Sequence, residues 1–135
     1  MRWRGGMAKG GGGIDGEGGF IVIQEVIYRP RLREVEPLLR LAEKATNPLE
    51  EVIGDTAEPV TAEWDRGENS ALRPVVVLRL SDFSGSVMAV FEPKELEEPT
   101  WLPRRLSFLW GDLLRIRSRK LLDSLLEAEG KQRDK

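Results

Sequence analysis

The pattern of apolar and polar positions is strongest near the C-terminus, in residues 101–128. Apolar side chains recur there at spacings of four, three, four and three, at Leu102, Leu106, Leu109, Leu113 and Ile116. Such spacing places them on one face of an α-helix. The pattern therefore predicts a single amphipathic helix from Trp101 to Ala128 whose apolar face is covered by the rest of the protein. Four further residues widen that face on one side: Trp110, Leu114, Leu121 and Leu125.

The leucine repeat changes phase near Arg117 and Lys120, which interrupt the apolar side of the predicted helix. We expect the helix to end its contact with the core there, to bend, or to meet a second surface. Gly111 also lies inside the helix and weakens it by about 1 kcal/mol relative to alanine. This glycine indicates either close packing against a neighbour or a local break.

Four other segments have the pattern of strands. Residues 20–28 carry apolar side chains on both faces, and residues 60–65 alternate between apolar and polar. Residues 75–80 form the most β-branched run, and residues 87–91 form a strand after a turn at 82–86. β-branched and alternating positions of this kind favour extended backbone. The sequence therefore predicts four strands.

Between the first two strands, residues 37–46 predict a helix with leucine and alanine on one side. Asn47 and Pro48, followed by Glu50 and Glu51, are typical of a fresh helix start: an N-cap residue, a proline in the first turn, and carboxylates near the positive end of the helix dipole. Gly54 is expected to end this second helix. We therefore predict a short helical hairpin with an acidic exterior.

The predicted order of elements is β-α-α-β-β-β-α, which is typical of an α+β fold. We expect a small antiparallel sheet with the long C-terminal helix packed on one face. The 135 residues suit one domain, placed at residues 20–129. Residues 1–19 hold nine of the fourteen glycines and predict a flexible tail, and residues 130–135 form a polar C-terminal tail. Whether translation starts at Met1 or Met7 stays open.

The amino-acid composition excludes several kinds of catalytic and metal-binding chemistry. The chain has no cysteine and no histidine. It therefore lacks disulfides, thiolate ligands, a cysteine nucleophile and the usual imidazole base. We expect no enzyme activity, no catalytic residue, no cofactor and no metal. No apolar run approaches the ~20 residues of a membrane span, and residues 1–4 are not followed by the apolar stretch of a secretory signal. We expect a cytoplasmic protein.

The net charge of −2 conceals a strong asymmetry. Residues 34–68 contain ten carboxylates and three cations, whereas residues 101–120 contain six cations and one carboxylate. Segments of opposite sign either face each other within one molecule or offer complementary surfaces to partners. The basic segment coincides with the long predicted helix, so this helix is the leading candidate for a binding surface.

Residues 82–86 spell D-x-S-x-S, with Asp82, Ser84 and Ser86 at the fixed positions. This spelling resembles the metal-binding loop of von Willebrand factor A-type domains, and the resemblance implies Mg²⁺ held by one aspartate and two serines. In that family a helix follows the loop, whereas here residues 87–91 predict a strand. We therefore favour a hairpin turn that Asp and Ser close through backbone hydrogen bonds.

The order helix, three strands, helix also resembles, in outline, a double-stranded-RNA-binding domain. Pro103, Arg104 and Arg105 come nearest to the lysine cluster at the start of that family's last helix. The preceding Glu95, Glu97 and Glu98 would repel phosphate. A nucleic-acid-binding module that uses the basic helix is therefore the alternative function.

The function that we favour is a non-catalytic protein–protein interaction module, a small adaptor or a subunit of a larger assembly. Arginine and tryptophan are enriched at binding hot spots. We expect Trp101 to be an exposed anchor. The cations that we expect to bind the partner are Arg104, Arg105, Arg115, Arg117, Arg119 and Lys120. A homodimer through the long helix or an uncovered strand edge is a further possibility. The partner's identity and pathway stay open.

Overall fold

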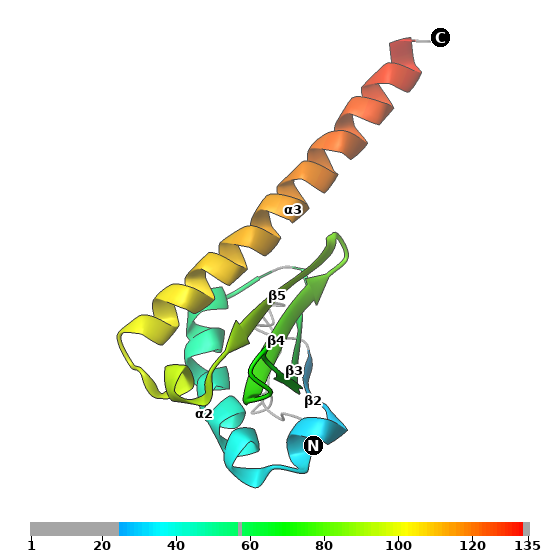
Figure 1. Cartoon of the computed structure of the whole chain (residues 1–135). Coiled ribbons are helices and arrows are strands. Elements are labelled where there is room, and N and C mark those ends of the chain that lie inside the picture. The colour runs from blue at the N-terminus through cyan, green and yellow to red at the C-terminus, as the bar shows by residue number, and fades with distance from the viewer. Residues whose placement is uncertain (1–24, 57, 134–135) are drawn as a thin grey trace.

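The structure, a computed structural model, describes residues 25–56 and 58–133 (Figure 1). In chain order the elements are β2 (Glu25–Tyr28), α1 (Pro30–Arg33), α2 (Glu36–Ile53), β3 (Thr61–Glu68), β4 (Pro74–Asp82), β5 (Gly85–Phe91), the 3₁₀ helix η1 (Pro93–Glu97) and α3 (Trp101–Arg133). The predicted α+β fold with a long C-terminal helix on the sheet is confirmed. The predicted tail of residues 1–19 and the start of the first strand, residues 20–24, lie outside the described residues.

Within the described residues the sheet has four strands, in the order β2-β3-β4-β5. β3 and β4 pair antiparallel, as do β4 and β5, but β2 runs parallel to β3, with Tyr28 opposite Trp64. The expected purely antiparallel sheet is therefore wrong, and the sheet is mixed. The reason is the connection between β2 and β3, because α1 and α2 carry the chain back before β3 begins. Parallel neighbours need a long crossover of this kind.

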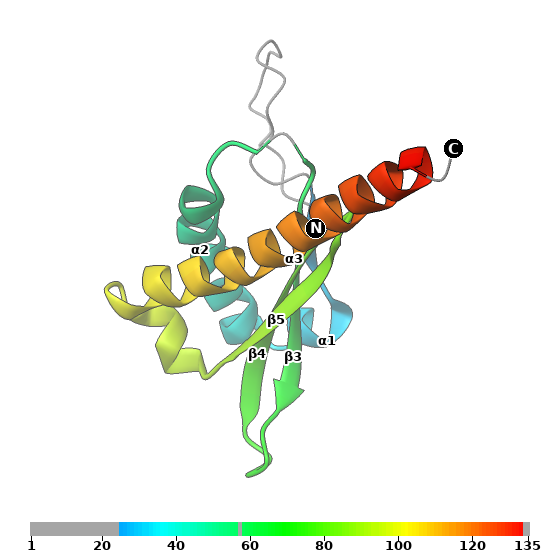
Figure 2. The same ribbon diagram turned by 90° about the horizontal axis from the view of Figure 1, so that it is seen from above.

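One face of the sheet carries the core. Alternate residues of β4, namely Val76, Leu78 and Leu80, are completely buried, whereas the intervening Val77 and Arg79 are only partly buried or exposed. This period of two is what a strand covered on one side requires. α2 and α3 lie side by side over the buried face (Figures 1 and 2).

α2 is one continuous helix from Glu36 to Ile53 with Pro48 inside it, so the predicted helical hairpin is wrong. Its apolar stripe crosses the proline without a break, through the buried Leu38, Ala42, Ala45, Leu49 and Ile53. Burial of this stripe outweighs the hydrogen bond that Pro48 cannot donate. The predicted end at Gly54 is confirmed, because Gly54 caps the helix at φ 62°.

A buried hydroxyl joins α2 to the sheet. Thr46 donates to the carbonyl of Ala42 at 2.9 Å, the Trp64 indole N–H donates to the Thr46 oxygen at 3.1 Å, and the Tyr28 hydroxyl lies 3.0 Å from that oxygen. A hydroxyl has one proton and two lone pairs, and the proton goes to Ala42, so Tyr28 is the donor in its contact. The Thr46 hydroxyl is therefore saturated, and it fixes where α2 sits on β2 and β3.

α3 is a single helix, as predicted, and it extends to Arg133 instead of ending at Ala128. Its first half packs on the sheet through Leu102, Leu106, Leu109 and Leu113, each at most 3% exposed. After Arg117 the helix continues without interruption past the sheet (Figures 1 and 2). Three outcomes were expected at the phase change near Arg117 and Lys120. The structure shows the first of them: the helix ends its contact with the core there.

The hairpin strands β3, β4 and β5 include the predicted segments 60–65, 75–80 and 87–91 almost completely and are longer. β3 extends through residues 66–68, and only Phe83 and Ser84 separate β4 from β5. No helix within residues 25–56 and 58–133 combines the length and the hydropathy that crossing a bilayer requires.

Candidate functional site

The most unusual surface of the protein is the part of α3 that projects beyond the sheet, which we call the overhang and define as residues 118–130. Every residue of the overhang is exposed. Leu121, Leu122, Leu125 and Leu126 are between 49% and 68% exposed. Monomeric proteins rarely expose a contiguous apolar patch larger than roughly a few hundred Å², and larger patches mark binding surfaces.

The overhang begins where the β4–β5 turn meets the helix. A Cβ atom on Gly85 would lie 3.2 Å from a methyl group of Ile116, and Gly85 has a φ of 154° that side chains rarely adopt. Glycine is therefore needed here both for its backbone conformation and for the close approach of turn and helix. This contact is close to the last point at which α3 touches the folded domain.

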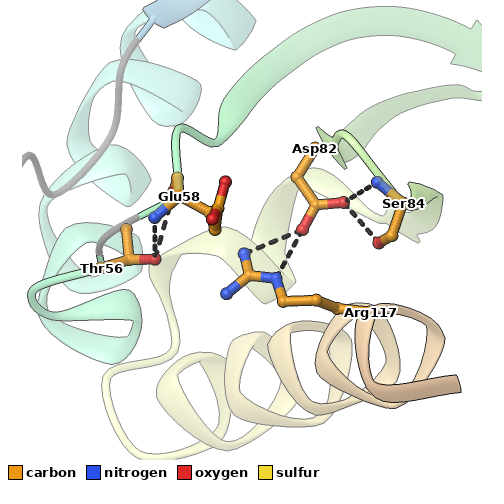
Figure 3. Close-up of polar contacts among 5 residues, drawn as sticks. All are labelled: Thr56, Glu58, Asp82, Ser84 and Arg117. Carbon is orange, nitrogen blue, oxygen red and sulfur yellow. Dashed lines mark hydrogen bonds and ion pairs between the residues drawn. The ribbon is translucent and has the colours of Figure 1, made fainter. Parts of the chain in front are cut away.

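One residue further along, Arg117 is tied to the same turn (Figure 3). Its Nε donates to Asp82 Oδ2 at 2.8 Å, and its Nη2 lies 2.8 Å from the same oxygen. The other oxygen, Oδ1, accepts the backbone N–H of Ser84 at 2.8 Å and its hydroxyl at 2.6 Å. The Asp82 side chain is fully buried and that of Arg117 is 14% exposed. Both carboxylate oxygens are thus occupied within the chain.

This arrangement explains the electrostatics of the turn. Burial of the Asp82 carboxyl opposes ionisation and raises its pKa, but the hydrogen bonds from Ser84 and Arg117 outweigh burial, so the pKa lies below its ordinary value. The predicted hairpin turn, closed by Asp and Ser through a backbone hydrogen bond, is confirmed. The guanidinium group of Arg117 occupies the place at the carboxylate that a cation would need.

A second closed turn lies in the same region, on the connection from α2 to β3. The Thr56 hydroxyl donates to the Glu58 carbonyl at 3.1 Å, and the Glu58 N–H donates to the Thr56 oxygen at 3.3 Å (Figure 3). These bonds satisfy the backbone where the chain enters the sheet. They have the character of a structural turn.

Three of the six cations proposed for binding are engaged within the molecule. Arg105 lies over the rings of Phe91 and Trp101, with its guanidinium carbon 5.3 and 5.8 Å from their centroids. Arg115 pairs with Asp112 one turn earlier in the helix, and Arg117 pairs with Asp82. Arg117 also lies 5.4 Å from the centroid of Trp110. The long basic face predicted for the helix is therefore partly consumed by the fold.

The other three cations remain available. Arg104, Arg119 and Lys120 are exposed and make no hydrogen bond or ion pair with any described residue. Arg119 and Lys120 lie at the start of the overhang, beside its leucines. The structure thus brings two of the predicted cations to the exposed leucine surface.

Trp101 is not the exposed anchor that the sequence predicted. Its ring packs edge-on against Phe91, with the centroids 6.3 Å apart and the planes at 88°, and it is only partly exposed. This T-shaped geometry is favourable for two aromatic rings in a core. The expectation of an exposed tryptophan is wrong, because its own sheet covers much of the side chain.

The leucines of the overhang are the residues that sequence reasoning misplaced. Leu121 and Leu125 were expected to widen the covered face of the helix, but they are 49% and 68% exposed. The signal that identifies them is the phase change at Arg117 and Lys120, which rotates the apolar side of the helix away from the sheet. A periodic pattern shows that a face is apolar, and it does not show what covers that face.

The described surface has further hollows, among them two of about 520 and 530 Å³ beside α2 and η1. One of about 370 Å³ is lined by residues of the β3–β4 loop and the start of η1, including Asn69, Arg73, Glu92 and Lys94. In the part of the chain that the structure describes, no three His, Cys, Asp or Glu residues are grouped so that they could hold a metal ion. Comparison with protein-family models, curated proteins and solved structures gave no match to this chain.

Proposed function

We propose that this protein is a non-catalytic interaction module, a small adaptor or a subunit of an assembly, that binds another protein through the overhang of α3. The observation that carries the proposal is the exposure of Leu121, Leu122, Leu125 and Leu126 on a helix anchored at its other end. An apolar helical face that inserts into a groove of a partner is a common recognition mode.

The anchoring is physically important. An isolated helix shorter than about 12–15 residues is marginal in water, and the overhang is of that size. The docked half of α3, held by its buried leucines and by the Arg117–Asp82 pair, supplies the helical nucleus from which the overhang extends. The leucines are therefore presented in a preformed helix, which lowers the ordering cost of binding.

The cations play a secondary part in this proposal. Arg119 and Lys120 flank the leucines and would contact an acidic rim of the partner, whereas Arg105 and Arg117 act within the fold. Arg104 lies on the docked half of the helix, away from the leucines. Charged residues at the edge of an interface mainly set association rate and orientation. We further propose a cytoplasmic location, which fractionation of cells checks.

Nucleic-acid binding through α3 has less support. Three of the six cations are engaged by Asp82, Asp112 or aromatic rings, so the helix offers no continuous row of free guanidinium groups for phosphates. Titration with RNA and DNA separates the two functions. Under the proposal, affinity is weak or absent at physiological salt, whereas nucleic-acid binding would show a steep dependence on salt.

The decisive experiment compares the wild-type protein with Leu122→Arg. Proteins that co-purify with the tagged wild-type chain from its own cells are identified, and binding of the purified partner is measured by calorimetry. We expect Leu122→Arg to raise the Kd at least tenfold without lowering the melting temperature, since Leu122 is exposed. The matched control is Leu72→Arg, because Leu72 is also exposed but lies on the β3–β4 loop. Equal binding by all three proteins would overturn the proposal.

A further inference from the structure

The four exposed leucines of the overhang are spaced symmetrically about their midpoint. Residues 121–126 read Leu-Leu-Asp-Ser-Leu-Leu, so the apolar positions are the same from either end. All four leucines are exposed. We propose that the partner of the overhang is a second copy of this chain, paired antiparallel about a two-fold axis between Asp123 and Ser124. This inference depends on the proposed function, since it names the partner of the same surface.

The register follows from the symmetry. In a two-fold antiparallel pair, residues equally distant from the axis lie beside each other. Leu121 of one copy then lies beside Leu126 of the second copy, and Leu122 lies beside Leu125. Every exposed leucine of the overhang meets a leucine, and the eight side chains form one cluster. A displaced register would place leucines against Asp123, Ser124 or the charged ends. A parallel pair in register would also bring leucine beside leucine, so the charges at the two ends of the overhang decide the direction.

The charges of the overhang favour the same direction. Its N-terminal end carries Arg119 and Lys120, and its C-terminal end carries Glu127 and Glu129. Antiparallel pairing brings the basic end of each copy beside the acidic end of the other, at both ends of the interface. Parallel pairing would bring like charges together twice. Such complementarity selects orientation in paired helices.

The folded domains leave room for this pairing. Leu122 follows the buried Leu113 by nine residues, about two and a half helical turns, so it points away from the side of α3 that meets the sheet. The second helix therefore lies along the outer side of α3, and the overhang extends past the sheet (Figures 1 and 2).

The absence of cysteine from the chain makes disulfide trapping a sharp test. Ser118 and Glu129 are equally distant from the proposed axis, and each lies one turn from a leucine of the cluster, Leu122 or Leu125. Within one helix they are about 16 Å apart along the axis. Antiparallel pairing about this axis places Ser118 of one copy beside Glu129 of the other, at the separation that a disulfide needs, whereas parallel pairing in register keeps them apart.

Ser118→Cys and Glu129→Cys are purified separately with tags of different size and oxidised alone and mixed. We expect a mixed disulfide in the mixture and little cross-linking in either variant alone. Wild-type protein should show concentration-dependent dimerisation in sedimentation equilibrium, weakened at least tenfold in Leu122→Arg and unchanged in Leu72→Arg. Circular dichroism confirms that the variants remain folded.

Equal cross-linking of the single variants and the mixture would overturn the antiparallel register. Absence of cross-links together with a monomer at every concentration would overturn pairing with a second copy. In that case the proposed function is judged separately, because a different protein that binds the wild type and fails to bind Leu122→Arg would still support it. If Leu122→Arg affects neither dimerisation nor binding of a different protein, both proposals fail.

Discussion

Asp82 and Arg117 lie 35 residues apart in the chain, and their side chains meet at 2.8 Å between the β4–β5 turn and helix α3. The contact fixes the helix to the sheet at the turn where α3 leaves the domain. Because the carboxylate is fully buried, a partner for its charge is obligatory. This pair defines the boundary between the docked half of α3 and the overhang.

Asp82→Asn should lower the free energy of unfolding by roughly 2–4 kcal/mol, because the substitution leaves the largely buried guanidinium of Arg117 without its countercharge. Urea unfolding followed by tryptophan fluorescence measures the effect. Asp112→Asn is the control, since the Asp112–Arg115 pair is exposed and should change stability by less than about 1 kcal/mol. Similar losses in both variants would contradict the structural role of the Asp82 pair.

The same pair predicts sensitivity to acid. The folded-state pKa of Asp82 lies below its ordinary value of about 4, so ionised Asp82 stabilises the fold above that pH, and the contribution is lost as pH falls toward the folded-state pKa. The stability difference between wild type and Asp82→Asn should therefore shrink below about pH 4. Unfolding curves at a series of pH values check this, and a difference that stays constant down to the lowest pH would contradict it.

Thr46→Val should cost roughly 2–4 kcal/mol of stability, because it leaves the buried donors of Trp64 and Tyr28 without their shared acceptor. Thr46→Ser keeps the hydroxyl and removes only a methyl group, so it should cost about 1 kcal/mol. Chemical unfolding of the two variants and the wild type measures both values. Equal losses would indicate that methyl packing, and not hydrogen bonding, is the role of Thr46.

Tyr28 is the only tyrosine of the chain, so ultraviolet absorbance during alkaline titration reports its ionisation alone. Burial raises the pKa of Tyr28 above its ordinary value of about 10. The fold should therefore be stable with respect to this group below pH 10 and lose stability as pH rises further. A midpoint at or below 10 in the folded protein would contradict this prediction.

Two glycines should respond to alanine in opposite directions. Gly85→Ala should destabilise by about 1–3 kcal/mol, because φ is 154° and the new Cβ would meet Ile116 at 3.2 Å. Gly111→Ala should stabilise by about 0.5–1 kcal/mol, since Gly111 is helical and its nearest neighbour would be 4.0 Å away. Thermal unfolding measures both, and destabilisation by Gly111→Ala would reveal a packing role for this position.

The elements that depend on the local spacing of residues could be predicted from the sequence, whereas features set by contacts between distant segments could not. The helix over residues 101–128 and the strands 60–65, 75–80 and 87–91 were predictable, because their side-chain periods are local properties of the backbone. The interpretation of Pro48 failed because burial of Leu49 and Ile53 overrides a local stop signal. The parallel pairing of β2 with β3 depends on where two helices return the chain, which no local period encodes.

The amino-acid sequence by itself determined that α3 forms, which of its sides are apolar, and that the apolar positions of residues 121–126 are the same from either end, since these follow from residue spacing in a helix of known pitch. Only the tertiary structure decided that the sheet covers α3 no further than about Ile116 and that Arg117 pairs with Asp82 within the chain. It also decided that the leucines after Arg117 are exposed to solvent. The physical reason is that the spacing of side chains along a helix fixes which of them share a face. Distant segments of the chain decide which of those side chains are buried and which charges they meet.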